Sequence, residues 1–359
     1  MSFIDLSFNK LQGHLPIPPY DIFAFSVSNN NFTGHISSMF CNATFLRALI
    51  LSHNHLSGMI PQCLGDVPDL RILDLQGNNI HGDIPIQFSP HNNFQTIKLS
   101  DNQLEGPLPK SLAKCTVLEV LDLAENNIED VFPSWLEMLQ ELKVFSLRAN
   151  KFHGTITTSF SAKHPFPMLR IFDVSNNKFS GPLPASFFEN FQGMKDLSDS
   201  AHHPPGLSYM NSSNIKLNGK IPQTLGNLTS LEWLDLSWNQ LNGEIPVSLT
   251  NLNFLAVLNL SQNHLEGMIP TGKQFNTFQN DSYMGNPMLC GFPLSKSCKN
   301  DDEQPPSSVI HQKEESLFGW KAVAVGYGCG MVFGMILGRL FIKTAKPMWL
   351  ARLLCGYTY

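Results

Sequence analysis

The chain repeats one short pattern along most of its length. Asn54, Asn78, Asn102, Asn126 and Asn150 are spaced 24 residues apart, and two apolar residues separated by one position precede each of them. Leu, Ile or Phe stands two residues after each asparagine, and in most repeats a glycine and then a proline follow. The series also includes Asn9, Asn30, Asn177, Asn239 and Asn263. A period of this length predicts a solenoid of stacked coils, in which each coil contacts only its neighbours.

Each repeat has a direct physical interpretation. The alternation of Leu73 and Leu75 predicts a short, half-buried strand, and equivalent strands of successive coils stack as a parallel sheet. Asn78 follows where the chain turns, and its amide carries donors and an acceptor that can satisfy the backbone groups of that turn. Gly82 permits a tight passage, and Pro85 fixes an extended return. The sequence therefore predicts an α/β-type repeat solenoid with a parallel β-sheet on its concave face.

The composition narrows the possible functions. The 359 residues include 24 Lys and Arg against 29 Asp and Glu, without the basic clusters that nucleic-acid binding requires. The 12 histidines are scattered, and the 7 cysteines contain no CxxC motif, so the sequence offers no zinc-like ligand set. We therefore expect no nucleic-acid partner, no catalytic residues, no metal or other cofactor, and no enzymatic activity.

One apolar segment near the C-terminus is long enough to cross a membrane. Residues 322–338 carry no charge, and the apolar stretch extends over residues 317–342 if Lys321 and Arg339 place their charged ends at the interface. Positive residues follow the segment, so the tail after it is expected inside the cell and the coils outside. A buried core helix is the alternative interpretation, but a solenoid offers no site to bury one.

Glycines recur on one face of this predicted transmembrane helix. Gly326, Gly330, Gly334 and Gly338 stand four residues apart, and small residues at this spacing let a second helix approach closely. We therefore expect this stripe to be a helix-pairing surface. The alternative is the general abundance of small residues in membrane helices, and Gly328 does lie off the stripe.

The departures from the repeat divide the chain into seven parts. Residues 185–213 fit no repeat and are expected to form an insertion loop, and the coil after them has Ile215 where asparagine is expected. The predicted parts are repeat coils (1–184, the first incomplete), the insertion loop (185–213), further coils (214–270), a C-terminal cap (271–298), an acidic juxtamembrane linker (299–316), the transmembrane helix (317–342) and a short cytoplasmic tail (343–359).

The strand face is the predicted ligand-binding surface, because the residues that flank each buried pair point to solvent. Their charge varies from coil to coil, as expected of a recognition surface, although a solvated face without a ligand is the alternative. The candidates are Arg71, Asp74, Gln76, Lys98, Asp101, Glu119, Asp122, Glu125, Lys143 and Arg148.

Several residues suggest a secretory environment. Six Asn-x-Ser/Thr acceptor sites are candidates for N-glycosylation, at Asn31, Asn42, Asn211, Asn227, Asn259 and Asn280. Cys41 and Cys63 flank one coil and are candidates for a disulfide, as are Cys290 and Cys298 in the cap. Cys115 has no evident partner and is expected to be a buried core residue.

The repeat LxxLxLxxNxLxGxIP, complete in residues 70–85, is identified as the 24-residue leucine-rich repeat of plant extracellular receptors. The coils, the acidic linker, the glycine-rich helix and the tail KPMWLARL together resemble the C-terminal portion of plant leucine-rich-repeat receptor-like proteins. This class lacks a kinase and includes many disease-resistance receptors. The resemblance implies a single-pass plasma-membrane protein with its N-terminus outside the cell. It also implies an extracellular protein, peptide or glycan ligand, and signalling in defence or development through an adaptor receptor kinase that pairs with the glycine stripe.

The chain also departs from that family. It starts within a repeat, without a secretory signal or an N-terminal cap, so we expect it to be N-terminally truncated. The stretch 185–213 resembles a shortened form of the island that the family carries before its last repeats. Two alternative functions follow from these features: a soluble-type binder or inhibitor, as in polygalacturonase-inhibiting repeat proteins, and a non-functional truncated fragment.

Overall fold

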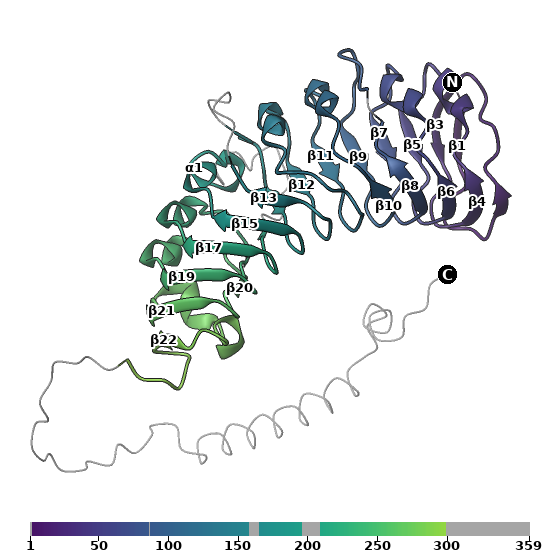
Figure 1. Cartoon of the computed structure of the whole chain (residues 1–359). Helices are drawn as coiled ribbons and strands as arrows, with labels where there is room; N and C mark the ends of the chain where they lie inside the picture. Colours follow the sequence, from purple (N-terminus) through teal and green to yellow (C-terminus); the bar gives the residue numbers. More distant parts are fainter. Residues whose placement is uncertain (1, 86, 158–164, 196–208, 299–359) are drawn as a thin grey trace, which may run out of the picture. The chain divides into compact units, whose positions relative to one another are not determined.

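The structure, a computed structural model, describes residues 2–85, 87–157, 165–195 and 209–298. These residues form a curved stack of coils, in which each turn of the chain lies beside the next (Figure 1). Residues 1–299 make one compact unit, and the second unit, residues 300–359, lies outside the described residues.

One parallel sheet of 11 strands runs through the whole stack. Its register aligns the buried residues of successive coils, since Leu73 pairs with Ile97 and Ile97 with Leu121. The predicted solenoid with a parallel sheet is therefore confirmed. The strands are β1 (Ser2–Asp5), β3 (Ile22–Ser26), β5 (Ala48–Ile50), β7 (Ile72–Asp74), β9 (Thr96–Lys98), β11 (Val120–Asp122), β12 (Val144–Ser146), β14 (Ile171–Asp173), β16 (Tyr209–Asn211), β18 (Trp233–Asp235) and β20 (Val257–Asn259).

A second layer of strands follows the turn of each coil and forms two further parallel sheets. The five-stranded sheet contains β2 (Gln12–His14), β4 (Asn31–His35), β6 (His55–Gly58), β8 (Asn79–Asp83) and β10 (Gln103–Glu105). The six-stranded sheet contains β13 (His153–Thr155), β15 (Lys178–Pro182), β17 (Lys216–Lys220), β19 (Gln240–Glu244), β21 (His264–Met268) and β22 (Met288–Cys290).

The two second-layer sheets are separated at the coil that contains Asp130. Neighbouring coils have Gly106 and Gly154 at the equivalent place, with φ of 74° and 77°, a conformation that glycine adopts without steric cost. With Asp130 there instead, this coil contributes one isolated bridge, Val131 to His153, to the described sheets. The break is thus explained by a single missing glycine.

Short helices return the chain on the outer side of the arc (Figure 1). They occupy the positions that follow the proline of most repeats, where the chain must descend to the next strand. The helices are η1 (Ser38–Asn42), η2 (Gln62–Asp66), η3 (Lys110–Lys114), η4 (Ser134–Met138), α1 (Ala185–Phe188), η5 (Gln192–Met194), η6 (Gln223–Asn227), η7 (Val247–Asn251), η8 (Lys273–Thr277) and η9 (Asn280–Ser282).

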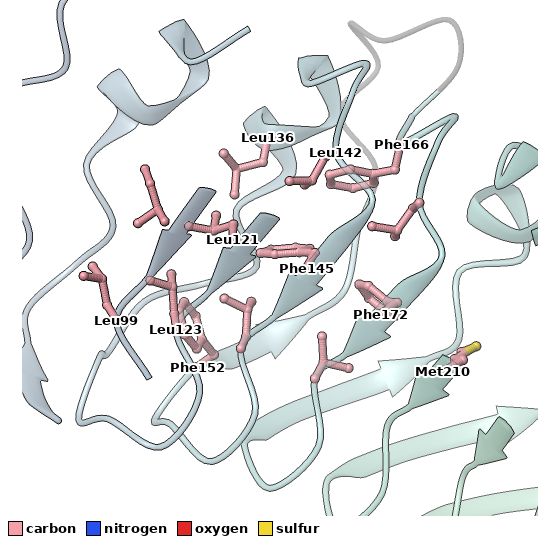
Figure 2. Packing of buried hydrophobic residues seen from close by; sticks show 14 of the residues in the cluster. Leu99, Leu121, Leu123, Leu136, Leu142, Phe145, Phe152, Phe166, Phe172 and Met210 are labelled. Carbon is pink, nitrogen blue, oxygen red and sulfur yellow. The ribbon is translucent and has the colours of Figure 1, made fainter. Parts of the chain in front are cut away.

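The apolar residues of both layers form one continuous core, and its middle is rich in phenylalanine (Figure 2). Phe132 lies at the centre of this region, with ring centroids 5.6 Å from Phe187, 6.1 Å from Phe179 and 6.3 Å from Phe145. The pairs with Phe179 and Phe145 are edge-to-face, a geometry that stabilises a fold by about 0.5–1.5 kcal/mol per pair beyond burial. The rings fill the space where the repeat lengthens between Asn150 and Asn177.

The range 185–213, expected to be an insertion loop, is part of the stack at both of its ends. Phe187, Phe191 and Met194 are fully buried in the common core. Strand β16, at the other end, pairs with β14 and β18 in the 11-stranded sheet. Residues 196–208 between them lie outside the described residues. The sequence pattern did not reveal these ends because phenylalanine and methionine stand where leucine usually does.

The cap after residue 270 continues the coils before closing them. It contains η8, η9 and β22, and β22 pairs with β21 at the end of the six-stranded sheet. In the described ranges, no helix has the length and apolar character that crossing a bilayer requires. The expected linker, transmembrane helix with its glycine stripe, and tail all lie outside those ranges.

Candidate ligand-binding face

A row of buried asparagines holds the strand face in place. In Asn126, Oδ1 accepts the Leu104 N–H at 3.0 Å, while Nδ2 lies 3.0–3.2 Å from the carbonyls of Leu99, Leu123 and Ala124. One side chain thus bonds to the backbone of its own coil and of the preceding coil. Because an unpaired buried polar group is costly, each asparagine fixes the distance between its own coil and the preceding coil. The same arrangement is found at Asn30, Asn54, Asn78, Asn102, Asn150, Asn177, Asn239 and Asn263.

The cap extends this row by one asparagine that sequence analysis missed. Asn286 Oδ1 accepts the Leu265 N–H at 3.0 Å, and Nδ2 lies 3.0 Å from Leu260 O and 2.9 Å from Tyr283 O. The available signal was its spacing of 23 residues from Asn263, with Leu289 following three residues later rather than two. The strand face is therefore supported to the end of the described chain.

The ten candidate ligand-binding residues lie along one stretch of this face, between β7 and β12. Asp74, Lys98 and Asp122 occupy the same register position on β7, β9 and β11. Four of the ten are exposed, namely Arg71, Asp101, Glu125 and Arg148, and the other six are half-buried. The structure thus brings the candidates together on neighbouring coils.

Several of these residues bind one another across neighbouring coils. Lys143 Nζ lies 2.7 Å from Glu119 Oε2, and the Arg148 guanidinium lies 3.5 Å from Glu125 Oε1. The Ser100 hydroxyl donates to Asp122 at 2.7 Å. Exposed ion pairs of this kind contribute about 0–1 kcal/mol, so a ligand can displace them at little cost.

Arg71 and Lys98 differ from the other cations of this stretch. Among the described residues, neither forms an ion pair or a side-chain hydrogen bond. The nearby Asp74 carboxylate is partly occupied, because it accepts the Gln76 N–H at 3.2 Å. Arg71 and Lys98 are therefore the cations most available to an anionic group of a ligand.

The remaining coils continue the row of Asp74 and Asp122 with further acidic and amide side chains. The same register position carries Asp173 on β14, Asn211 on β16, Asp235 on β18 and Asn259 on β20. Asp235 Oδ1 accepts the Ser237 N–H at 2.9 Å, and Asn259 Nδ2 lies 3.5 Å from Asp235 Oδ2. Asp235 was not among the sequence-predicted candidates, although its alignment with Asp122 could have identified it.

A cavity lies at the C-terminal end of this second stretch of the face. It encloses about 410 Å³ between β20 and the cap, and its lining includes Asn259, Ser261, Gln279 and Asp281. The chain here passes from repeat to cap, so the cavity walls come from two different kinds of backbone. Apolar residues, among them Val257, Leu258 and Phe278, complete the lining, so the cavity suits a ligand with both apolar and hydrogen-bonding groups.

The five cysteines among the described residues lie away from the strand face. Cys41 and Cys63 form a disulfide that links η1 to η2 on the outer side, and Cys290 and Cys298 form a second one in the cap. Cys115 is fully buried without a disulfide, and burial raises the pKa of its thiol to about 12. This thiol therefore stays protonated and is shielded from solvent. Within the described ranges, no three metal-binding side chains cluster together.

The six glycosylation candidates divide into two groups. Asn31, Asn42, Asn227 and Asn280 are exposed, and none of them belongs to the 11-stranded sheet. Asn211 is buried and Asn259 half-buried within that sheet, where both side chains accept backbone hydrogen bonds. A glycan on either of the last two would occupy the concave strand face.

Comparisons with known proteins agree with this architecture. Profiles described as leucine-rich repeat match residues 24–80, 93–115, 168–190 and 230–252, and another matches residues 114–131. Receptor-like protein 9DC3 of Solanum pimpinellifolium is 44% identical over 86 residues, which is 23% of this chain and 10% of that protein. Receptor like protein 22 of Arabidopsis thaliana is 37% identical over 78 residues, again 10% of its length. The match therefore spans about a tenth of these curated relatives.

Solved structures also share the fold. The crystal structure of PEPR1-AtPEP1 superimposes with a TM-score of 0.68 and 25% identity, covering 80% of this chain and 38% of that one. The plant peptide hormone receptor RGFR1 in complex with RGF2 gives a TM-score of 0.61 and 25% identity, covering 81% and 48%. Together with the repeated coils, these matches show a leucine-rich-repeat solenoid that is similar to part of the plant receptor-like proteins.

Proposed function

We propose that this chain binds an extracellular ligand through the strand face and acts as a receptor-like subunit at the plasma membrane. The observation that carries the proposal is the face itself: a row of bonded asparagines holds it rigid, and charged side chains project from it over β7–β12. A preorganised surface loses little conformational freedom on binding, which favours affinity. The relatives and neighbouring structures named above, receptor-like proteins and a peptide hormone receptor with its ligand, support this function.

The charge pattern suggests which ligand groups each stretch would bind. Arg71 and Lys98 are free to pair with carboxylates, whereas the half-buried Asp235 offers a carboxylate to basic or hydroxyl groups. An extended peptide with acidic residues towards one end and donors towards the other fits this order. Such a peptide would run across the strands, from one coil to the next.

A peptide-selection experiment tests this proposal. Peptides selected from a random library for binding to the intact chain are expected to lose affinity when Arg71 and Lys98 are both changed to glutamate. The matched control is Lys110→Glu with Lys114→Glu, which reverses two charges on η3 at the outer side. Equal losses in both double variants would count against the strand face as the binding surface.

Signalling would depend on the segment at residues 317–342, which we propose spans the plasma membrane once, with the coils outside. The glycine stripe at Gly326, Gly330, Gly334 and Gly338 would then pair with the membrane helix of a receptor kinase. Changing Gly330 and Gly334 to leucine is expected to abolish co-purification of the kinase and to leave peptide binding intact. Co-purification that survives both changes would argue against pairing through this stripe.

The same location implies N-glycosylation. We propose glycans at Asn31, Asn42, Asn227 and Asn280, which are exposed, and none at Asn211 or Asn259, whose side chains lie within the sheet. Mass spectrometry of tryptic peptides from the secreted or membrane-inserted protein reports each site separately. A glycan at Asn211 would be incompatible with the described packing of β16.

A further inference from the structure

Trp238 has an unusual backbone conformation for its size. Its φ is 54°, in the left-handed region, and its side chain is 61% exposed. The same conformation recurs at the equivalent position of the other coils, and asparagine tolerates it far better than a bulky side chain does. The non-glycine residues at this position in the other coils are Phe8, Asn29, His53, Asp101, Glu125, Ala149, Asn176, Asn214 and Gln262. Burial cannot explain the tryptophan, because most of its surface remains in water. The backbone conformation is thus a property of the repeat, and what distinguishes this coil is a large aromatic ring left exposed there.

The surroundings of Trp238 form a shallow site that crosses several coils. A cavity of about 290 Å³ is lined by Trp238 and Gln240 of one coil, Gln262 and His264 of the next, and Ile215 of the preceding coil. Ile215 stands where the other coils have an asparagine of the row, so the wall beside the tryptophan is apolar at this point. The site lies where the 11-stranded sheet turns into the second layer, away from the β7–β12 stretch.

Some polar side chains of this cavity are already hydrogen-bonded within the fold, and others are not. Asn239 and Asn263 also line it, but both are committed to the asparagine row. The side chains of Gln240, Gln262 and His264 make no hydrogen bond or ion pair with the described part of the chain. No Asp, Glu, Lys or Arg lines the cavity. The free groups are therefore two amides and an imidazole around an exposed aromatic plane.

We propose that Trp238 is the stacking platform of a subsite for a neutral sugar ring. A pyranose has an apolar face of C–H groups, which suits the flat indole, and a rim of hydroxyls, which suits amides that both donate and accept. A charged ligand would need a counter-charge that the lining lacks, since burying an unpaired charge is costly. Gln240, Gln262 and His264 orient the hydroxyls, and Trp238 supplies the contact area. This subsite is separate from the proposed peptide-binding stretch.

Binding of neutral oligosaccharides to the intact chain, purified in a mild detergent, tests the proposal. Cellotetraose is the neutral probe, tetragalacturonate the charged one, and a neutral peptide containing phenylalanine represents a protein ligand. Isothermal titration is expected to show saturable binding of cellotetraose and weaker binding of the other two. Trp238→Asn is expected to weaken cellotetraose binding by about tenfold or more, as for an aromatic anchor. Its melting temperature should not fall, because asparagine suits the φ of this position.

Further variants separate the subsite from a general effect on folding. Gln262→Ala is expected to weaken cellotetraose binding by a smaller factor, while Phe254→Ala removes another half-exposed aromatic outside the cavity and should change nothing. The Arg71→Glu and Lys98→Glu variant should also bind the sugar normally, so failure of one proposal does not imply failure of the other. Unchanged affinity in Trp238→Asn, no binding by the original chain, or stronger binding of the peptide or the uronate would each overturn the proposal.

Discussion

Two neighbouring coils follow the same backbone path with different buried residues. The coil of β18 has Leu236 in the second apolar position and Asn239 in the row, as the repeat requires. The preceding coil, that of β16, has Ser212 and Ile215 instead, and both are buried. The backbone is nonetheless equivalent, since Ser212 N–H and Leu236 N–H each donate to the following strand at 2.9 Å.

This comparison shows that a coil can take its path from its neighbours. In a stack, each coil is bonded on two sides, so one irregular coil costs stability without losing its shape. The irregular coil also carries a visible defect, because the Ser212 hydroxyl is buried and has no hydrogen-bond partner. We therefore expect the two kinds of coil to respond differently to the same substitutions.

The largest effect is expected from making a regular coil irregular. Asn126→Ile removes the bonds to the backbone of two neighbouring coils and leaves the Leu104 N–H without its partner. The expected loss is about 3 kcal/mol or more in the free energy of unfolding, because several buried polar groups become unpaired at once. Urea unfolding of the full chain, followed by circular dichroism, measures it. A loss below about 1 kcal/mol would mean that the row is not an energetic support.

The converse change should be tolerated. Ile215→Asn restores the row, and the carbonyls of Val174 and Ser212 already accept bonds from Asn177 and Asn239. These new bonds offset the lost apolar burial, so we expect a change within about 1 kcal/mol. The matched control is Ile128→Asn, another buried isoleucine outside the row, which should cost about 3 kcal/mol or more. Similar losses in the two variants would contradict this interpretation.

Smaller effects are expected at two buried serines, and the two effects should have opposite signs. Ser212→Ala removes an unpaired hydroxyl and should stabilise the chain by about 1 kcal/mol. Ser175→Ala removes a hydroxyl that donates to Asp173 at 2.6 Å, and should destabilise it by about 1 kcal/mol. The midpoints of urea unfolding compare the two. If both variants shift in the same direction, hydrogen bonding is not what distinguishes the two serines.

The smallest effect is expected from the ion pairs of the exposed face. Lys143→Met breaks the contact with Glu119, and we expect a loss of about 0.5 kcal/mol that shrinks further as salt is added. Thermal unfolding at low and high ionic strength measures this difference. A loss above about 2 kcal/mol, independent of salt, would show that the pair is structural and not available to a ligand.

The repeat spacing made the coil predictable because it is a local property. An asparagine between fixed apolar positions specifies the strand, the turn and the next contact, so residues 70–85 alone suffice to recognise the coil. Irregular coils lack this local pattern and cannot be recognised from it. Strand β16 could not be foreseen from Met210 and Ser212, which match the repeat poorly, and it forms because β14 and β18 hold it on either side.

The position of the candidate site could be predicted from the sequence, but the pairing of its charged side chains could not. Alternation along each strand places Arg71, Asp74 and Lys98 on one face, whatever the rest of the chain does. Which of these charges are paired depends on distances between coils, as for Lys143 and Glu119, and these are set by the curvature of the stack. The exposure of Trp238 beside Gln262 has the same origin, since they belong to different coils.

The sequence by itself determined the solenoid, its parallel sheet and the row of asparagines, because each depends on residues a few positions apart. Only the tertiary structure decided that Asn286 extends the row, that Asn211 is buried while Asn42 is exposed, and that the sheet continues through β16. These outcomes depend on contacts between coils. Each such contact involves two segments that are distant in sequence, and the local pattern describes each segment without the other.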